Sequence, residues 1–284
     1  MLELLAAGLV YVETLYPEWG QQMKMDKILH EEKTEWQDLC IFENSRFGKV
    51  LALDGVIQTT EADNDIYSEM MTHVPFLAHG HVKNVLIVGG GDGSILRQAL
   101  CYKDLERAVV VDIDASVVST TKEWMPNICG KAFDDVRAQV IIQDATQYVK
   151  ECTEQFDVII CDSTDPFGPG EVLFTEEFYG NCKKLLTPGG IFVNQNGVPF
   201  LQKNELDLTL KNRSPYFKNV GFYVVAMPTY VGGFMAIGFA TDATADLPST
   251  AELAQRMRSI EGEMLYYTPQ IHKAAFALPA FMER

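Results

Sequence analysis

The sequence predicts an α/β protein with a doubly wound, largely parallel sheet and a small antiparallel β domain ahead of it. Two patterns indicate this fold class. After Lys83, continuous apolar runs alternate with amphipathic helical stretches, which is typical of a parallel sheet covered by helices on both faces. Between Gln37 and Thr60, by contrast, short alternating runs are separated by turn residues, as in an antiparallel sheet. With 284 residues, 47% of them hydrophobic, the chain can bury a substantial core.

The N-terminal β unit is predicted from three apolar runs and two turns. Its candidate strands are residues 39–42, 50–53 and 56–59, and its turns are Glu43-Asn44-Ser45 and Asp54-Gly55. From Asp65 to Ala78 the apolar spacing becomes helical, so a helix should connect this unit to the rest of the chain. We expect an N-terminal β-stranded domain at residues 1–64 and a Rossmann-like domain at residues 65–284, packed as one body.

The larger domain is predicted to contain five buried strands. They are Val85–Val88, Ala108–Val111, Val140–Ile142, Val158–Ile160 and Ile191–Val193. A helix should begin after Thr175, where Glu176 and Glu177 complement the helix dipole, and should end after Lys183-Lys184. Residues 222–226 and 235–240 indicate a closing hairpin, and the capping box Ser249-x-x-Glu252 predicts one last helix.

The charge balance argues against some classes of partner. The formal net charge is −16, from 39 acidic and 23 basic residues, which disfavours binding to nucleic-acid phosphates or to anionic lipid. A cationic small molecule would be attracted, although an acidic surface can also serve solubility alone. No stretch approaches the roughly 20 apolar residues of a membrane span. The apolar residues 1–10 contain Glu3 and no basic residue, which does not fit a signal peptide. Six cysteines without metal-ligand spacing indicate reduced thiols, so we expect a cytoplasmic protein.

Acidic residues follow four of the predicted strands. They are Asp92 in Gly89-Gly-Gly-Asp-Gly93, Asp112 in Val111-Asp-Ile-Asp114, Asp144 in Ile142-Gln-Asp144 and Asp162 in Ile160-Cys-Asp162. Ligands of open α/β sheets bind beyond the carboxyl ends of the strands, so these side chains are expected to line one site.

The first three of these positions describe an adenosyl pocket. The glycine loop lets backbone approach a ligand closely, but Ser94 stands where a dinucleotide fingerprint needs glycine or alanine. Asp112, about 20 residues after the loop, suits hydrogen bonds to ribose hydroxyls. Asp144, at the next strand end, suits the edge of an adenine. Rossmann-like methyltransferases have such a pocket, in which no pyrophosphate has to be bound.

Asp92 favours a donor without a carboxylate. S-adenosylmethionine ends in a carboxylate and an ammonium, and a fixed negative charge facing that end would repel the carboxylate. The decarboxylated compound ends in a pure cation, which Asp92 would attract. The alternative is that Asp92 only caps the helix that follows the glycine loop.

Asp162 and Asp165 suit the activation of an amine. A primary alkylamine arrives protonated, because its pKa resembles that of lysine, about 10.4. A carboxylate can hold the ammonium, accept its proton and direct the freed lone pair at the carbon next to sulfur. The alternative is an Asx-type turn in which both acids are structural.

Seven ordered motifs, from about Gln37 to Pro279, make the chain resemble the spermidine synthase family. They are Trp36-Gln-Asp38, Leu53-Asp-Gly-Val-Ile-Gln58, Tyr67-x-Glu69-Met70, Gly89-Gly-Gly-Asp-Gly93, Asp162-Ser-Thr-Asp-Pro166 with Gly168-Pro169, Pro228-Thr-Tyr230 and His272-x-Ala-Ala-Phe276. The resemblance implies a β-stranded N-terminal domain on a methyltransferase-like domain, in a homodimer or homotetramer. It also implies aminopropyl transfer from decarboxylated S-adenosylmethionine, a co-substrate, to putrescine, with no cofactor and no metal.

The same resemblance implies roles for individual residues. Donor-binding residues would be Gln37, Asp92, Asp112, Asp144, Ala145 and Pro169, and acceptor-binding residues would be Tyr67, Ser68, Asp162, Asp165 and Tyr230. Among them Asp162 would be the catalytic residue, as the proton acceptor.

Several positions depart from the family pattern. Asp112 is one methylene shorter than the usual glutamate, and Ala145 adds a methyl group to the usual glycine. Ala62, Asn64 and Ser68 stand where arginine, glutamate and histidine or glutamine are common, so agmatine or cadaverine as the acceptor is an alternative. An N-methyltransferase using ordinary S-adenosylmethionine is a second alternative. A polyamine- or nucleoside-binding protein without turnover is a third.

Three further expectations concern the surroundings of the site. Tyr11 is a candidate for an aromatic wall residue that is often tryptophan in the family. The segment Ser163–Val172, rich in glycine and proline, is a candidate lid. The five histidines do not follow the acidic strand ends and are expected to be structural, while Met70-Met71, Phe174, Phe178 and Tyr179 are expected to pack the core.

Overall fold

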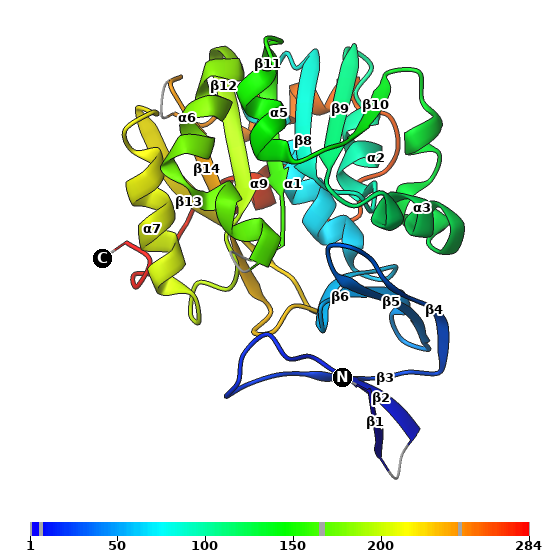
Figure 1. Ribbon diagram of the computed structural model, residues 1–284. Coiled ribbons are helices and arrows are strands. Elements are labelled where there is room, and N and C mark those ends of the chain that lie inside the picture. Colours follow the sequence, from blue (N-terminus) through cyan, green and yellow to red (C-terminus); the bar gives the residue numbers. More distant parts are fainter. Residues whose placement is uncertain (1, 6–7, 165–167, 244–245, 284) are drawn as a thin grey trace.

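The computed structural model describes residues 2–5, 8–164, 168–243 and 246–283. A seven-stranded sheet with helices on both faces forms the larger part, and two small sheets built from the first 60 residues lie beside it (Figure 1). The predicted fold class, a Rossmann-like sheet preceded by antiparallel β structure, is confirmed.

The N-terminal region contains more strands than the sequence predicted. Its first sheet consists of β1 (Leu2–Leu5), β2 (Gly8–Val12) and β3 (Gln22–Lys24), and its second of β4 (Lys27–Lys33), β5 (Asp38–Asn44), β6 (Gly48–Leu53) and β7 (Val56–Thr60). The three expected strands are confirmed as β5, β6 and β7. The turn at Asp54-Gly55 is confirmed as well, because both residues have positive φ, as a tight hairpin requires. The polar strand β4 gave no apolar pattern from which to predict it.

The large sheet has the order β10-β9-β8-β11-β12-β14-β13, and its strands are β8 (Asn84–Gly89), β9 (Arg107–Asp112), β10 (Ala138–Ile142), β11 (Phe156–Asp162), β12 (Leu186–Gln195), β13 (Asn219–Ala226) and β14 (Phe234–Thr241). The five predicted strands run parallel, and β13 and β14 form the expected antiparallel hairpin. One expectation is wrong: β10 is an edge strand rather than a buried one, and Ile142 is 48% exposed.

The helices follow the strands in the expected rhythm. They are α1 (Asn64–His79), α2 (Ser94–Leu100), α3 (Ala115–Trp124), α4 (Pro126–Cys129), α5 (Ala145–Glu151), α6 (Glu176–Leu185), α7 (Lys203–Arg213), α8 (Thr250–Arg256) and α9 (Pro269–Ala275), with short 3-10 turns at Ala132–Asp134, Gly168–Phe174 and Met257–Ser259. The predicted starts of α6 and α8 are confirmed, since Thr175 and Ser249 accept the capping hydrogen bonds. The expectation that α8 is the last helix is wrong, because α9 follows it.

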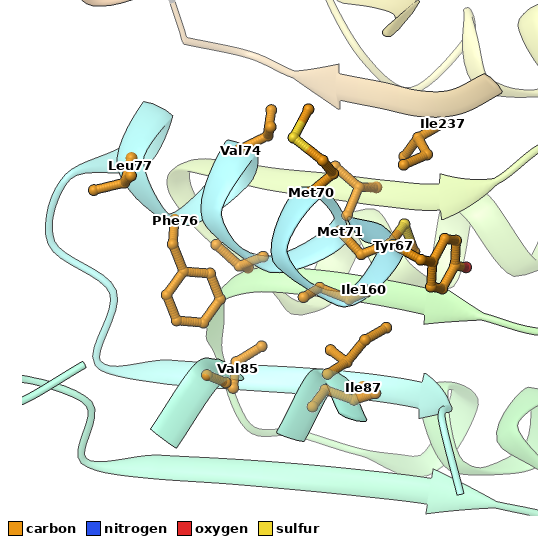
Figure 2. Close-up of a cluster of buried hydrophobic side chains, with 14 of the residues drawn as sticks. Tyr67, Met70, Met71, Val74, Phe76, Leu77, Val85, Ile87, Ile160 and Ile237 are labelled. Atoms are coloured by element: carbon orange, nitrogen blue, oxygen red, sulfur yellow. The ribbon is translucent and has the colours of Figure 1, made fainter. Parts of the chain in front are cut away.

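The core has two layers because alternate residues of each central strand point to opposite faces of the sheet. Val85 and Ile87 of β8 pack with α1, and Figure 2 shows Met70, Met71 and Val74 of that helix lying over the strands. Leu86 and Val88 face the other layer, which contains α5 and α6. The core positions expected for Met70-Met71, Phe174, Phe178 and Tyr179 are confirmed by their burial.

The second small sheet packs directly on the large domain. Leu39, Leu51 and Leu53 form one apolar cluster with Val117 of α3 and with Met125 and Ile128 beside it. This contact places the β6–β7 hairpin and the Gln37 region over the carboxyl edge of the large sheet. Among the described helices, none is long and apolar enough to cross a membrane.

Candidate active site

A cavity of about 430 Å³ lies at the carboxyl ends of β8 and β11. These two strands are neighbours in the sheet, and the strand order runs in opposite directions from them, so the cavity occupies the topological switch point of the fold. The glycine loop, the start of α1, the β6–β7 hairpin and the loop between β13 and β14 all contribute to its walls. The four acidic strand ends, Asp92, Asp112, Asp144 and Asp162, line it together, as the sequence predicted.

Glycine is required in the loop after β8 for close packing against the acids. Gly89 has a φ of 75°, and a side chain there would clash with the carbonyl oxygen of Asp162. Gly91 donates its N–H to Asp112 Oδ2 at 3.0 Å, and a Cβ at Gly91 would lie only 2.6 Å from the same oxygen. The loop therefore brings the ends of β8, β9 and β11 into direct contact.

Asp162 is the central carboxylate of the cavity. Tyr67 of α1 donates its hydroxyl to Asp162 Oδ1 at 2.6 Å. Burial and, to a smaller extent, the negative charge of Asp92 together raise the pKa of the Asp162 carboxyl to about 7, while the Tyr67 hydrogen bond acts in the opposite direction. A carboxyl group with this pKa is close to the point at which it can exchange a proton at neutral pH.

Asp92 supports the helix that follows the glycine loop and also lines the cavity. Its Oδ1 accepts from Ser94 N at 2.9 Å and from Ser94 Oγ at 2.8 Å, so it supports the start of α2. It also lines the cavity, and burial raises the pKa of its carboxyl. Asp112 resembles it, because burial raises its pKa to about 6 although it accepts from the N–H groups of Gly91 and Asp114.

Most of the expected donor-side residues line the cavity. Asp144 caps α5, since its Oδ1 accepts from Thr146 N at 2.7 Å, and Asp144, Ala145 and Gln37 all line the cavity. Gln37 is held by Asp114, to which its Nε2 donates at 2.9 Å. Pro169 falls in the 3-10 turn Gly168–Phe174, but its side chain is outside the described part of the chain.

The two tyrosines expected on the acceptor side lie next to each other. Tyr67 and Tyr230 line the cavity, with their rings edge to face at 5.9 Å between centroids. The Tyr230 hydroxyl donates to the carbonyl oxygen of Gln58 at 2.7 Å. Asp165 lies outside the described residues, as do two further residues of the candidate lid Ser163–Val172.

Ser68 and Tyr11 do not themselves line the cavity. Of the described α1 residues, Asn64 and Tyr67 line the cavity, whereas Ser68 is fully buried behind them and donates its hydroxyl to Asn64 Oδ1 at 3.2 Å. Ser68 does not itself line the cavity, and its part in acceptor binding stays a prediction. Tyr11 stacks on Phe42 at 5.2 Å in the core of the small sheets, so its proposed place in the wall is wrong. Tyr16 lines the cavity from the same N-terminal region.

Comparisons with known proteins show the family of this chain. The family model described as "Spermine/spermidine synthase domain" matches residues 64–249, and that described as "Spermidine synthase tetramerisation domain" matches residues 9–61. The chain belongs to the spermine/spermidine synthase family. Curated relatives named polyamine aminopropyltransferase include that of Shigella flexneri, 52% identical over 272 residues, and that of Escherichia coli O139:H28, 51% identical over 272 residues. Each alignment covers 95% of this chain and 94% of the relative.

Solved structures show the same similarity. A spermidine synthase in complex with the transition-state analogue AdoDATO superimposes with a TM-score of 0.91 and 36% identity, covering 99% of this chain and 96% of that one. The spermidine synthase from Thermotoga maritima gives a TM-score of 0.90 and 35% identity, with coverages of 99% and 95%. This member of the family is an aminopropyltransferase, and the relatives favour that activity over the N-methyltransferase alternative.

The aminopropyltransferase cavity also contains residues that the sequence analysis missed. Gln195 ends β12 and lines the cavity, and its Oε1 accepts from Gly197 N at 2.8 Å. The strand-end rule would have found it had the rule been extended to the fifth parallel strand. Glu13 also lines the cavity, 4% exposed, and accepts from Gln21 Nε2 and from Ile57 N, each at 3.1 Å. No sequence motif near Glu13 predicted that it lines the cavity.

The buried histidines take part in the packing of the family fold. His73 lies 2.9 Å from the Tyr102 hydroxyl, and burial lowers its pKa to about 3. His272, in the motif shared with the family, lies 2.8 Å from the Tyr267 hydroxyl, and burial lowers its pKa to about 4. The described residues contain no group of three or more His, Cys, Asp or Glu side chains placed to hold a metal ion.

Proposed function

We propose that this aminopropyltransferase moves the aminopropyl group of decarboxylated S-adenosylmethionine to putrescine, giving spermidine and methylthioadenosine. The observation that carries the proposal is the position of Asp162. Its carboxylate accepts a hydrogen bond from Tyr67. It lines the same cavity as Asp92 and as Asp112 and Asp144, the residues expected to contact the adenosyl group. An amine bound at Asp162 would therefore face the reactive end of a donor bound along the other carboxylates.

Donor selection is assigned to Asp92. The carboxylates of Asp92, Asp112 and Asp162 lie close enough for the charge of Asp92 to raise the pKa of the other two. The three carboxylates repel one another. A donor that carries a further carboxylate, such as ordinary S-adenosylmethionine, would add to this repulsion, whereas the cationic aminopropyl end of the decarboxylated donor would relieve it. Gln37, Ala145 and Pro169 complete the proposed adenosyl contacts.

The proposed reaction needs one proton transfer and one displacement. The Asp162 carboxylate accepts a proton from the bound ammonium, and the freed nitrogen lone pair attacks the carbon next to sulfur. The new C–N bond forms as the C–S bond breaks, and the sulfonium sulfur keeps the electron pair and becomes a neutral thioether. No acid is needed for the leaving group, and no cofactor takes part. Tyr67, Tyr230 and Asp165 would border the acceptor.

The identity of the acceptor can be tested with a panel of amines. Putrescine, cadaverine and agmatine would be incubated with decarboxylated donor, followed by methylthioadenosine release and the mass of the product. We expect putrescine to give the highest kcat/KM, with spermidine as the product. Because Asn64 lines the cavity where the family usually has glutamate, cadaverine and agmatine are the informative competitors. Release with agmatine but none with putrescine would contradict the spermidine assignment.

A homo-oligomer is also proposed. The two small sheets contain the residues that match the tetramerisation model, 9–61. A homodimer or a homotetramer agrees with that match, and the tetramer is the form that the model's description names.

A further inference from the structure

Asp63 occupies the N-cap of α1 but its side chain is directed elsewhere. An aspartate at this position ordinarily accepts a hydrogen bond from a backbone N–H in the first turn of its own helix. The described structure contains no such side-chain cap at α1. The Asp63 carboxylate is 5% exposed, and a buried carboxylate needs hydrogen-bond donors from some other element.

Its donors come from two other segments. Thr60, at the end of β7, donates its hydroxyl to Asp63 Oδ1 at 2.6 Å. Thr229 donates twice to Oδ2, from its backbone N at 3.1 Å and from its hydroxyl at 2.7 Å. Thr229 is 1% exposed and lies in the loop between β13 and β14. Hydrogen bonds to an ionised, buried acceptor are stronger than neutral ones, so this contact is a strong tie between distant parts of the chain.

Asp63 and Thr229 each lie close in sequence to a tyrosine of the proposed acceptor site. Asp63 precedes α1, one turn before Tyr67, which donates to Asp162. Thr229 precedes Tyr230, whose hydroxyl reaches Gln58 and whose ring meets that of Tyr67. One carboxylate therefore joins the two backbone segments that carry the tyrosine pair.

The donor side has a separate tie of the same kind. Asp114, 3% exposed, accepts from Thr34 Oγ1 at 2.8 Å and from Gln37 Nε2 at 2.9 Å, both at Oδ2. It joins the segment that carries Gln37 to the start of α3. The two halves of the cavity are thus held by different buried carboxylates.

We propose that Asp63 is a positioning residue for the amine acceptor: it holds Tyr67 and Tyr230 at the spacing that the diamine requires, without contacting the substrate. The inference rests on the proposed function, because it assigns the tyrosine pair to the acceptor side. Loss of the Asp63 contact should weaken acceptor use while leaving the donor pocket intact.

The variant Asp63→Asn tests this directly. Asparagine keeps the shape but is neutral, and its NH2 group replaces one of the two accepting oxygens. Either the Thr60 hydroxyl must turn from donor to acceptor or Thr229 loses its acceptor, and the remaining hydrogen bonds lose the charge of the carboxylate. We expect KM for the diamine to rise about tenfold, with the Kd for methylthioadenosine unchanged within about twofold. The reciprocal variant Asp114→Asn should weaken methylthioadenosine binding and leave KM for the diamine nearly unchanged.

The partner residue provides a second, independent variant. Thr229→Val removes one of the three bonds and should raise KM for the diamine in the same direction, whereas Thr229→Ser should behave like the wild type. In the double variant the two effects should not add, since they break one contact. Should Asp63→Asn fail to fold, Thr229→Val and Thr229→Ser still distinguish the contact from bulk packing.

Three results would overturn the inference. They are a wild-type KM in Asp63→Asn, an equal loss of donor and acceptor affinity, and fully additive effects in the double variant. Wild-type protein that transfers no aminopropyl group to any amine would instead contradict the proposed function, and the inference with it. Active wild type with an unaltered Asp63→Asn variant contradicts the inference alone.

Discussion

Asp162 is chemically useful because two opposing influences act on one carboxyl group. Burial and the charge of Asp92 disfavour its ionised form, while the hydroxyl of Tyr67 stabilises that form. In the proposed mechanism, Asp162 is a base that is ionised at mildly alkaline pH and still basic enough to accept a proton from a bound ammonium. A fully exposed aspartate, with a pKa of about 3.9, would be a much weaker base.

This balance predicts the pH dependence of the reaction. When the pH is below the Asp162 pKa of about 7, the carboxyl is mostly protonated and cannot accept the proton of the amine. The kcat/KM for putrescine should therefore rise with pH up to neutrality and then level off. Initial rates of methylthioadenosine release across roughly pH 5 to 9 would measure it. A flat profile, or one that falls through neutrality, would contradict the assignment.

At this scale the sequence predicted the acids well and their neighbours less well. The strand-end rule is a property of parallel sheets, so Asp92, Asp112, Asp144 and Asp162 were predictable without a structure. Ser68 does not itself line the cavity because successive helical residues point about 100° apart, and Tyr67 is the one that faces it. Ser68 instead donates to Asn64, one turn earlier, and Asn64 does line the cavity.

Among the elements, the sequence analysis used the local start signals of two helices and overlooked those of a third. The starts of α6 and α8 follow from the capping residues Thr175 and Ser249. The helix α9 also begins with a capping residue, Thr268, followed by Pro269, but at seven residues it is too short to be stable alone, and Glu69 of α1 holds the segment before it. Glu69, 1% exposed, accepts from the backbone N–H groups of Leu265, Tyr266 and Tyr267.

The Glu69 contact predicts a stability effect. Glu69→Gln replaces one acceptor oxygen by an amide that faces N–H donors, and it should lower the free energy of unfolding by about 2 kcal/mol. Urea denaturation would measure the loss. Glu263→Gln, at an exposed position in the same C-terminal segment, is the matched control and should change stability by less than about 0.5 kcal/mol. Equal stabilities of the two variants would show that Glu69 does not hold this segment.

In the whole molecule, the large sheet and the second small sheet contribute different parts of the cavity. The large sheet supplies the acidic strand ends, and the second small sheet covers them through the cluster of Leu39, Leu51 and Leu53 with α3 and α4. The first small sheet, β1 to β3, contributes Tyr11 and Met23 to a core that it shares with Phe42, Val50 and Ile57 of the second small sheet. The sequence did not predict this sheet, because its strands are short and partly polar.

The same region leads to a prediction about assembly. Light scattering on the purified protein should give two or four times the chain mass of 31.8 kDa, because residues 9–61 match a tetramerisation domain. The mass of a single chain over the accessible concentration range would contradict the proposed homo-oligomer.

The central claim is that Asp162 accepts the proton of the amine during aminopropyl transfer. The most direct measurement is turnover of Asp162→Asn with decarboxylated donor and putrescine, together with calorimetric binding of methylthioadenosine. Asparagine retains an oxygen for the Tyr67 hydrogen bond but cannot act as the base. We expect kcat to fall by at least about 100-fold, with the Kd for methylthioadenosine nearly unchanged. A variant that turns over at the wild-type rate would contradict the account.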